Sequence, residues 1–195
     1  MVKSVKKNYS NAKSSKIREF IKIHFLSSPL FQTKSANEKV LDLGCGWGFY
    51  FKINPNAYGI DADENCVNYL KNLGYKTIQG DIRNQIPFKN NHFKWVICHD
   101  VLEHFELNEV EKIFPEIHRI LESNGCFFIL IPNQKGYEFG CRTNAGHKHF
   151  INLQEILSIA KENFILQKSF FYPFPKIIGD YFTHNKEIII LKKIK

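Results

Sequence analysis

Short apolar runs alternate along the chain with polar segments that contain glycine, proline or asparagine. Runs of about four to eight residues rich in Val, Ile, Tyr and Phe are typical of buried strands. The predicted strands are residues 39–44, 58–61, 76–81, 94–100, 125–132, 164–171 and 186–193. The run at 125–132, "GCFFILIP", is almost wholly apolar, which is typical of a central strand in a parallel sheet.

Several of the polar segments carry apolar residues at the three- and four-residue spacing of a helix. The predicted helices are one that begins at Ser14 or Ser15 and ends near Ser27, and residues 64–74, 106–121 and 152–162. Strands that alternate with helices predict a parallel sheet that is covered on both faces. We therefore expect an α/β, Rossmann-like fold: a seven-stranded, mostly parallel sheet with helices on both faces and an antiparallel C-terminal strand.

The length of 195 residues is enough for one domain with a sizeable hydrophobic core. Residues 1–13 are basic and polar, so we expect a flexible tail there, followed by a single domain at 14–195. Residues 133–151 contain Asn, Gln, Gly, Arg and His with little periodicity. A loop of that length is typical of a lid over a binding site, and we expect a substrate lid at 133–151.

The net charge of +8 raises the question of a nucleic-acid partner. Many of the basic residues gather at the two ends of the chain, where basic tails are usually solvated, so we do not favour nucleic acid. No apolar run is long enough to span a membrane, and the N-terminus lacks the apolar segment of a secretory signal. Five dispersed cysteines without a CxxC pair indicate reduced thiols rather than a zinc site. We expect a cytoplasmic protein.

The stretch "VLDLGCGWGFY", residues 40–50, places three glycines at alternating positions directly after a predicted strand. Glycine loses more conformational entropy on folding than other residues, so this cluster indicates that a ligand approaches the backbone closely. Such a turn presents backbone N–H groups to the ligand. The dinucleotide fingerprint G-x-G-x-x-G needs a glycine where Phe49 stands, which argues against a dehydrogenase. The pattern is instead D-x-G-x-G-x-G, from Asp42 to Gly48.

This pattern resembles the first motif of the class I S-adenosylmethionine-dependent methyltransferases, and further matches to that family follow in order. The matching segments are "DLGCGWG" at 42–48, Asp61, "GDI" at 80–82, and residues 86–105 and 120–133. The resemblance therefore covers residues 39–133, which it implies to be the cofactor-binding core. Residues 146–164 are similar to the C-terminal part of the small-molecule methyltransferase subgroup.

The resemblance implies that S-adenosylmethionine is the cofactor and that the glycine turn touches it. Asp61 would accept hydrogen bonds from the ribose hydroxyls, and Asp81 would accept one from the adenine amino group. Asp42 would shape the turn, accept a bond from the cofactor's amino group, or do both through a water. The residues expected to bind the cofactor are Asp42, Gly44, Cys45, Gly46, Asp61, Ala62, Asp81, Ile82 and His99.

Methyl transfer requires a base only when the acceptor atom is protonated and weakly acidic. An imidazole titrates near neutral pH, which suits this task. His104 follows the fourth predicted strand, and His147 and His149 alternate in the expected lid, so that one of them would pack and the other would face the pocket. We expect His149 to face the pocket, because Phe150 and Ile151 would anchor it. His149 and His104 are thus the candidate catalytic residues.

We expect methyl transfer to a small-molecule acceptor, at oxygen, because the cofactor fold and one lid take up the chain. Two alternatives stay open: an RNA 2′-O-methyltransferase, and a partner subunit that binds cofactor without catalysis. In the RNA alternative Asp100, Glu103 and His104, with His147 or His149, would suit Mg²⁺ or a transition metal. Metal-free relatives carry a similar Glu-His pair, so we expect no metal.

Overall fold

The computed structural model describes residues 28–33, 38–143, 145–182 and 185–194. Its contacts divide the chain into two units, Met1–Gln32 and Thr33–Lys195. A short 3-10 helix, η1 (Ser28–Thr33), lies at the boundary between them. The expected tail at 1–13 and the expected first helix lie outside the described residues. Every element discussed below belongs to the second unit.

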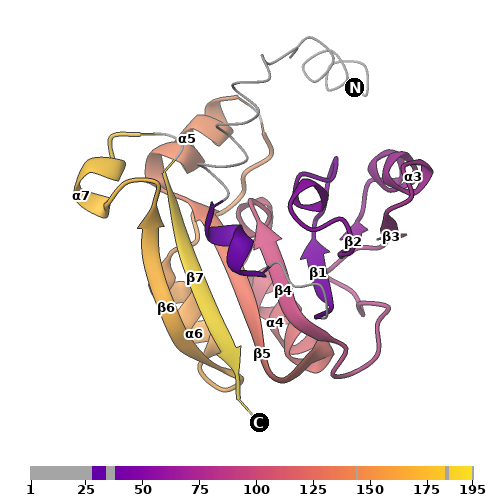
Figure 1. The fold of residues 1–195 in the computed structure, drawn as a ribbon. Coiled ribbons are helices and arrows are strands. Elements are labelled where there is room, and N and C mark those ends of the chain that lie inside the picture. Colours follow the sequence, from indigo (N-terminus) through magenta and orange to yellow (C-terminus); the bar gives the residue numbers. More distant parts are fainter. Residues whose placement is uncertain (1–27, 34–37, 144, 183–184, 195) are drawn as a thin grey trace. The chain divides into compact units, whose positions relative to one another are not determined.

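A seven-stranded sheet is the scaffold of this unit (Figure 1). Its strands are β1 (Val40–Leu43), β2 (Tyr58–Asp61), β3 (Lys76–Gln79), β4 (Phe93–His99), β5 (Leu121–Pro132), β6 (Phe164–Tyr172) and β7 (Lys186–Lys193). The order across the sheet is β3-β2-β1-β4-β5-β7-β6. β7 is antiparallel to both of its neighbours, and the other pairs of strands are parallel. The expected α/β fold with one antiparallel C-terminal strand is confirmed.

The strands of the sheet are linked by helices on both of its sides. The helical elements are η2 (Tyr50–Lys52), α3 (Glu64–Asn72), η3 (Leu102–His104), α4 (Leu107–Ile120), α5 (Gln134–Arg142), α6 (Leu153–Ala160) and α7 (Lys176–Gly179). α3 joins β2 to β3 and α4 joins β4 to β5, and these two crossovers run in opposite directions across the sheet. Right-handed crossovers therefore place α3 and α4 on opposite faces. Figure 1 shows α4 and α6 behind the sheet.

The hydrophobic core lies between the sheet and α4. Side chains alternate along each strand, so every second residue of β1, β4 and β5 joins one buried cluster with the apolar stripe of α4. Members of this cluster include Leu41, Val96, Phe127, Ile113 and Phe114. Ile97 and Phe128 alternate with them on the other face and are also fully buried, as expected for central parallel strands.

Side-chain caps fix where two helices near the functional end of the sheet begin. The carboxylate of Asp63 accepts a hydrogen bond from the backbone N–H of Asn65 at 2.8 Å and so starts α3 directly after β2. Asn152 and Glu155 form a reciprocal capping box at the start of α6. These caps are local in sequence, and the predicted helix starts agree closely with them.

The segment at 133–151, expected to be a loop, contains the helix α5. Asn133 starts this helix, because its Oδ1 accepts a hydrogen bond from the backbone N–H of Gly136 at 2.9 Å. Its Nδ2 donates to the backbone carbonyls of Gly179 and Phe182. A single residue of α5 is buried, so the helix has no apolar stripe from which periodicity predicts it. Its cap and these distant hydrogen bonds define it instead.

The remaining differences from the sequence prediction are small. β5 begins at Leu121 rather than at 125, and the other strand limits agree within two residues. The described residues contain no helix that is both long and apolar enough to cross a bilayer. All five cysteines carry free thiols, of which Cys141 alone is exposed.

Candidate active site

A pocket of about 320 Å³ opens at the carboxyl end of the parallel strands, beside the point between β1 and β4 where the strand order reverses. Open α/β sheets bind their ligands at such a point. Six of the residues that we expected to bind the cofactor or to act in catalysis line this pocket: Gly44, Asp61, Ala62, Asp81, Ile82 and His104. Its remaining wall residues are Gly80, Arg83, Asp100, Val101 and Phe105. The pocket therefore joins the ends of four neighbouring parallel strands, β3, β2, β1 and β4, to η3.

The glycines after β1 serve different purposes. Gly44, Gly46 and Gly48 all have positive φ angles, of 67°, 47° and 83°, which residues other than glycine rarely adopt. A Cβ on Gly44 would lie 2.6 Å from a methyl group of Val101, so this position has no room for a side chain. Among the described residues, a Cβ on Gly46 would meet no atom within 4 Å. Gly44 is required by packing, whereas Gly46 borders open space.

Asp61, at the end of β2, holds the glycine turn in place. Its Oδ2 accepts a hydrogen bond from the backbone N–H of Gly46 at 2.7 Å, and its Oδ1 accepts one from Asp63 at 2.8 Å. An ionised carboxylate has about four acceptor sites, so two remain for hydroxyl groups of a ligand. The same carboxylate can thus shape the turn and bind a ribose.

Asp42 lies in β1, beneath the turn rather than in the pocket wall, and it is almost fully buried. Burial raises its pKa from the ordinary 3.8 to about 8, and the nearby negative charge of Asp61 contributes. Burial likewise raises the pKa of the Cys45 thiol. Asp42, Cys45, Gly46 and His99 are expected cofactor residues that lie outside the pocket wall.

A chain of ion pairs connects the floor of the pocket to the 133–151 segment. Arg83 donates through Nε to both carboxylate oxygens of Asp81, and through Nη1 to Glu109 Oε1 at 2.8 Å. Glu109 Oε2 lies 3.6 Å from the Nζ of Lys148. The hydrogen bonds from Arg83 hold the pKa of Asp81 below its usual value. The sequence does not reveal this series of ion pairs, because its residues are far apart in the sequence.

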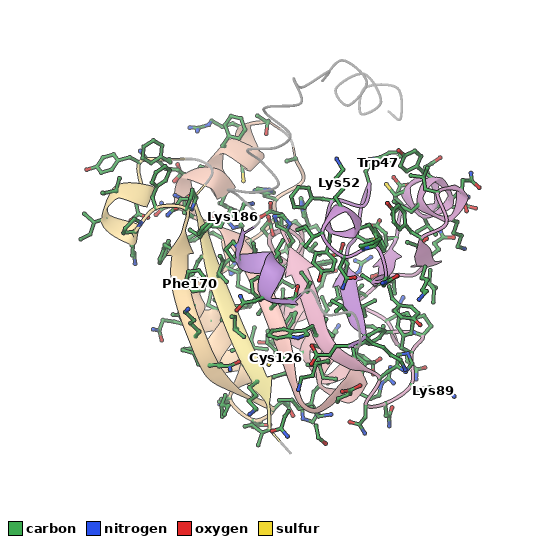
Figure 2. All side chains as sticks on the ribbon, in the orientation of Figure 1. Trp47, Lys52, Lys89, Cys126, Phe170 and Lys186 are labelled. Carbon is green, nitrogen blue, oxygen red and sulfur yellow. The ribbon has the colours of Figure 1, made fainter. Side chains whose placement is uncertain are left out.

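The turn after β4 presents a second carboxylate. Asp100 has a φ of 55°, an unusual conformation for a residue other than glycine, and such strain is concentrated at functional sites. Its Oδ2 pairs with the Nζ of Lys186, the first residue of β7, and lies 3.4 Å from Nε2 of His99. Burial raises the pKa of Asp100, but Lys186 and His99 outweigh burial and lower it overall. Figure 2 shows Lys186 at this end of β7.

Glu103 and His104 occupy η3, directly after this turn. Glu103 is only 1% exposed, and burial, followed by the charge of Asp100, raises its pKa to about 8. Nδ1 of His104 bonds the carbonyl oxygen of Gly146 at 3.2 Å. The ring of His104 meets that of His147 edge to face, with their centroids 5.0 Å apart.

The structure places His147, rather than His149, next to His104. The ring of His147 stacks on Tyr137 of α5, and its Nδ1 bonds the carbonyl oxygen of Tyr137 at 3.0 Å. Nε2 of His149 instead bonds Glu155 of α6 at 3.0 Å. The two histidines do point apart, as an extended segment requires. Neither of these two histidines is part of the pocket wall.

Comparison with known proteins agrees with this geometry. The family model described as "Methyltransferase domain" matches residues 41–129. The uncharacterized protein MJ0638 of Methanocaldococcus jannaschii is 31% identical over 146 residues, which are 68% of this chain and 63% of that protein. The tRNA (carboxymethyluridine(34)-5-O)-methyltransferase of Schizosaccharomyces pombe is 35% identical over 107 residues, which are 51% of this chain and 45% of that protein. The chain thus spans less than two thirds of these curated relatives.

Solved structures share the whole fold. A SAM dependent methyltransferase from Archaeoglobus fulgidus superimposes with a TM-score of 0.73, covering 90% of this chain and 94% of that chain. The sequence identity is 14%, so this likeness shows the fold alone.

The pocket fits the cofactor of this family. Open space borders Gly46, where a nucleoside can approach the backbone. The carboxylates of Asp61 and Asp81 can accept hydrogen bonds from hydroxyl and amino groups, and Ile82 and Phe105 offer apolar surface to a flat base. The motif order, the fold and the matching family model agree: residues 41–129 of this chain are a methyltransferase domain, and its motifs and fold are those of the class I S-adenosylmethionine-dependent methyltransferases, with S-adenosylmethionine as the cofactor.

Proposed function

We propose that this chain transfers the methyl group of S-adenosylmethionine to an oxygen atom of a tRNA nucleoside. The observation that carries this proposal is the 35% identity to a Schizosaccharomyces pombe protein named for oxygen methylation of a tRNA nucleoside. The net charge of +8 supports a polyanionic acceptor, since lysines and arginines neutralise phosphates. From the sequence alone we favour a small-molecule acceptor, because the cofactor fold and one lid take up the chain and because much of the positive charge lies at its two ends.

The chain's own contribution to such a transfer is alignment and exclusion of water. The bound cofactor supplies a methyl group on a positively charged sulfur, which is already a strong electrophile. Asp61 and the glycine turn fix the nucleoside end of the pocket, and η3 presents His104 at its wall. Holding the acceptor oxygen in line with the methyl group accounts for much of the rate enhancement available. In this proposal His104 contacts the acceptor, whereas His149 bonds Glu155 of α6 and does not.

A transfer experiment tests the proposal. Purified full-length chain is incubated with S-adenosylmethionine labelled in its methyl group, and with either tRNA or small molecules from cells that lack this chain. We expect label in tRNA, released by ribonuclease as a modified nucleoside. The Asp61→Ala variant is the control: any label that it incorporates comes from a source other than the cofactor site of this chain. Label confined to the small-molecule fraction would refute a tRNA acceptor.

A small-molecule acceptor is the second candidate, favoured by the pocket of about 320 Å³, a size typical of small-ligand sites. Salt distinguishes the two candidates. Binding of RNA through several phosphate contacts falls by a factor of about 10³ or more as salt rises from roughly 50 to 200 mM. Binding of an uncharged small acceptor stays nearly constant over that range.

A further inference from the structure

Three side chains next to the pocket converge although they come from two separate segments. Glu103 and His104 belong to η3, and His147 comes from the irregular stretch between α5 and α6. Each offers one ligand atom, and these atoms lie within 4.8 Å of one another. The backbone holds the two segments together, since the N–H of Lys148 donates to the carbonyl oxygen of Glu103 at 2.8 Å. His104 is also part of the pocket wall, so the cluster adjoins the site of methyl transfer.

The carboxylate of Glu103 lacks a partner that its burial requires. The residue is 1% exposed, and within the described parts of the chain its Oε2 is buried without a hydrogen-bond donor. An unpaired buried polar atom costs free energy, so native proteins rarely keep one without a reason. Oδ1 of Asp100 is likewise buried without a hydrogen-bond partner among the described residues, although Oδ2 of the same side chain pairs with Lys186. A cation bound at Glu103 would supply the partner that its buried oxygen lacks.

The two imidazoles are oriented as metal ligands are. Nδ1 of His104 and Nδ1 of His147 each meet a backbone carbonyl oxygen, at 3.2 and 3.0 Å. A carbonyl oxygen can only accept, so Nδ1 carries the proton in both rings, and in the neutral ring Nε2 keeps a free electron pair. Hydrogen bonds of this kind orient the histidines of metal sites. No residue other than glycine fits at position 140, because a Cβ there would overlap the ring of His147.

We propose that Glu103, His104 and His147 bind one divalent transition-metal ion. Two imidazoles and one carboxylate suit zinc, manganese, iron or cobalt, and three protein ligands leave coordination positions open. The ligand atoms would close on the ion by small side-chain rotations. Because His104 lines the pocket, an open position would face the acceptor; if the proposed methyl transfer is correct, that position takes the acceptor oxygen. Metal binding itself does not depend on the acceptor.

Cobalt provides a direct probe, since its visible absorption reports coordination by protein ligands. Full-length protein without an affinity tag is stripped of metal and titrated with Co²⁺, in the absence of cofactor and tRNA. We expect saturable binding of one ion per chain, displaced by Zn²⁺. Loss of an outer hydrogen-bond partner alone weakens metal sites by about 10- to 100-fold. Glu103→Gln and His147→Ala, which remove direct ligands, should weaken binding at least as much.

His149→Ala is the matched control, because its ring pairs with Glu155 outside the cluster. This variant should bind Co²⁺ as the wild type does. Circular dichroism establishes that each variant is folded, and an unfolded His147→Ala is replaced by His147→Gln. Wild type without saturable binding, or both ligand variants binding as tightly as wild type, would overturn the proposal. An equal loss in all three variants would indicate surface binding and would also overturn it.

Discussion

Asp61 is the residue whose substitution should weaken cofactor binding most clearly. Its carboxylate accepts two backbone hydrogen bonds, at 2.7 and 2.8 Å, and retains two acceptor sites for ribose hydroxyls. Asp61→Asn keeps the shape but turns one oxygen into a donor, which cannot bond an N–H. Hydrogen bonds to a charged group contribute about 1.5–3 kcal/mol each. Losing one such bond to the ribose weakens binding roughly 10- to 150-fold.

Calorimetric titration of the full chain with S-adenosylhomocysteine measures this effect. Asp63→Asn is the matched control, because Asp63 lies two residues away and caps α3, where Asn is an equally good cap. The control should bind like the wild type, within about a factor of three. If Asp61→Asn also stays within that range, Asp61 does not bind the ribose, and the assignment of the pocket to the nucleoside is refuted.

Other substitutions test the surrounding geometry. Gly46→Ala should fold, with a loss of about 1–3 kcal/mol in unfolding free energy because residue 46 has a positive φ. It should bind the cofactor at least tenfold more weakly, because the new Cβ enters the space of the ligand. Normal affinity in calorimetry would contradict this prediction. Gly44→Ala adds a clash at 2.6 Å to its positive φ and should lose roughly 2–5 kcal/mol in urea unfolding. In the folded chain Asp42 keeps its proton up to a pKa of about 8, whereas in the unfolded chain it loses the proton near pH 3.8. The free energy of unfolding should therefore fall as the pH rises between these two values, by up to ~1.4 kcal/mol per pH unit. Asp42→Asn should flatten that slope, and an unchanged slope would refute the assignment. His149→Ala should cost at most about 1 kcal/mol of stability, as expected for a partly exposed pair, and leave turnover within a factor of about three. A hundredfold loss of turnover would instead show that His149 is the base, as the sequence predicts.

The strands and the glycine turn are predictable because their signals are local. Apolar runs mark the strands, and the D-x-G-x-G-x-G spacing together with Asp61 and Asp81 places the pocket at neighbouring strand ends.

The parts that sequence reasoning misses are set by contacts between distant segments. α5 is held by Asn133, which bonds backbone carbonyls more than forty residues away, so periodicity does not reveal it. Because α5 is missed, the sequence does not predict that the ring of His147 meets that of His104 while His149 bonds Glu155. Lys186 reaches Asp100 only because β7 is antiparallel and begins at the end of the sheet where β4 finishes.

The most direct test of the central claim is a crystal structure of the full-length chain bound to S-adenosylhomocysteine. We predict that the ligand lies along the glycine turn, with its ribose hydroxyls within hydrogen-bonding distance of Asp61 and its adenine beside Asp81 and Ile82. A ligand bound elsewhere on the chain, or one that leaves the carboxylate of Asp61 without a contact, would contradict the claim that this pocket is the methyltransferase site.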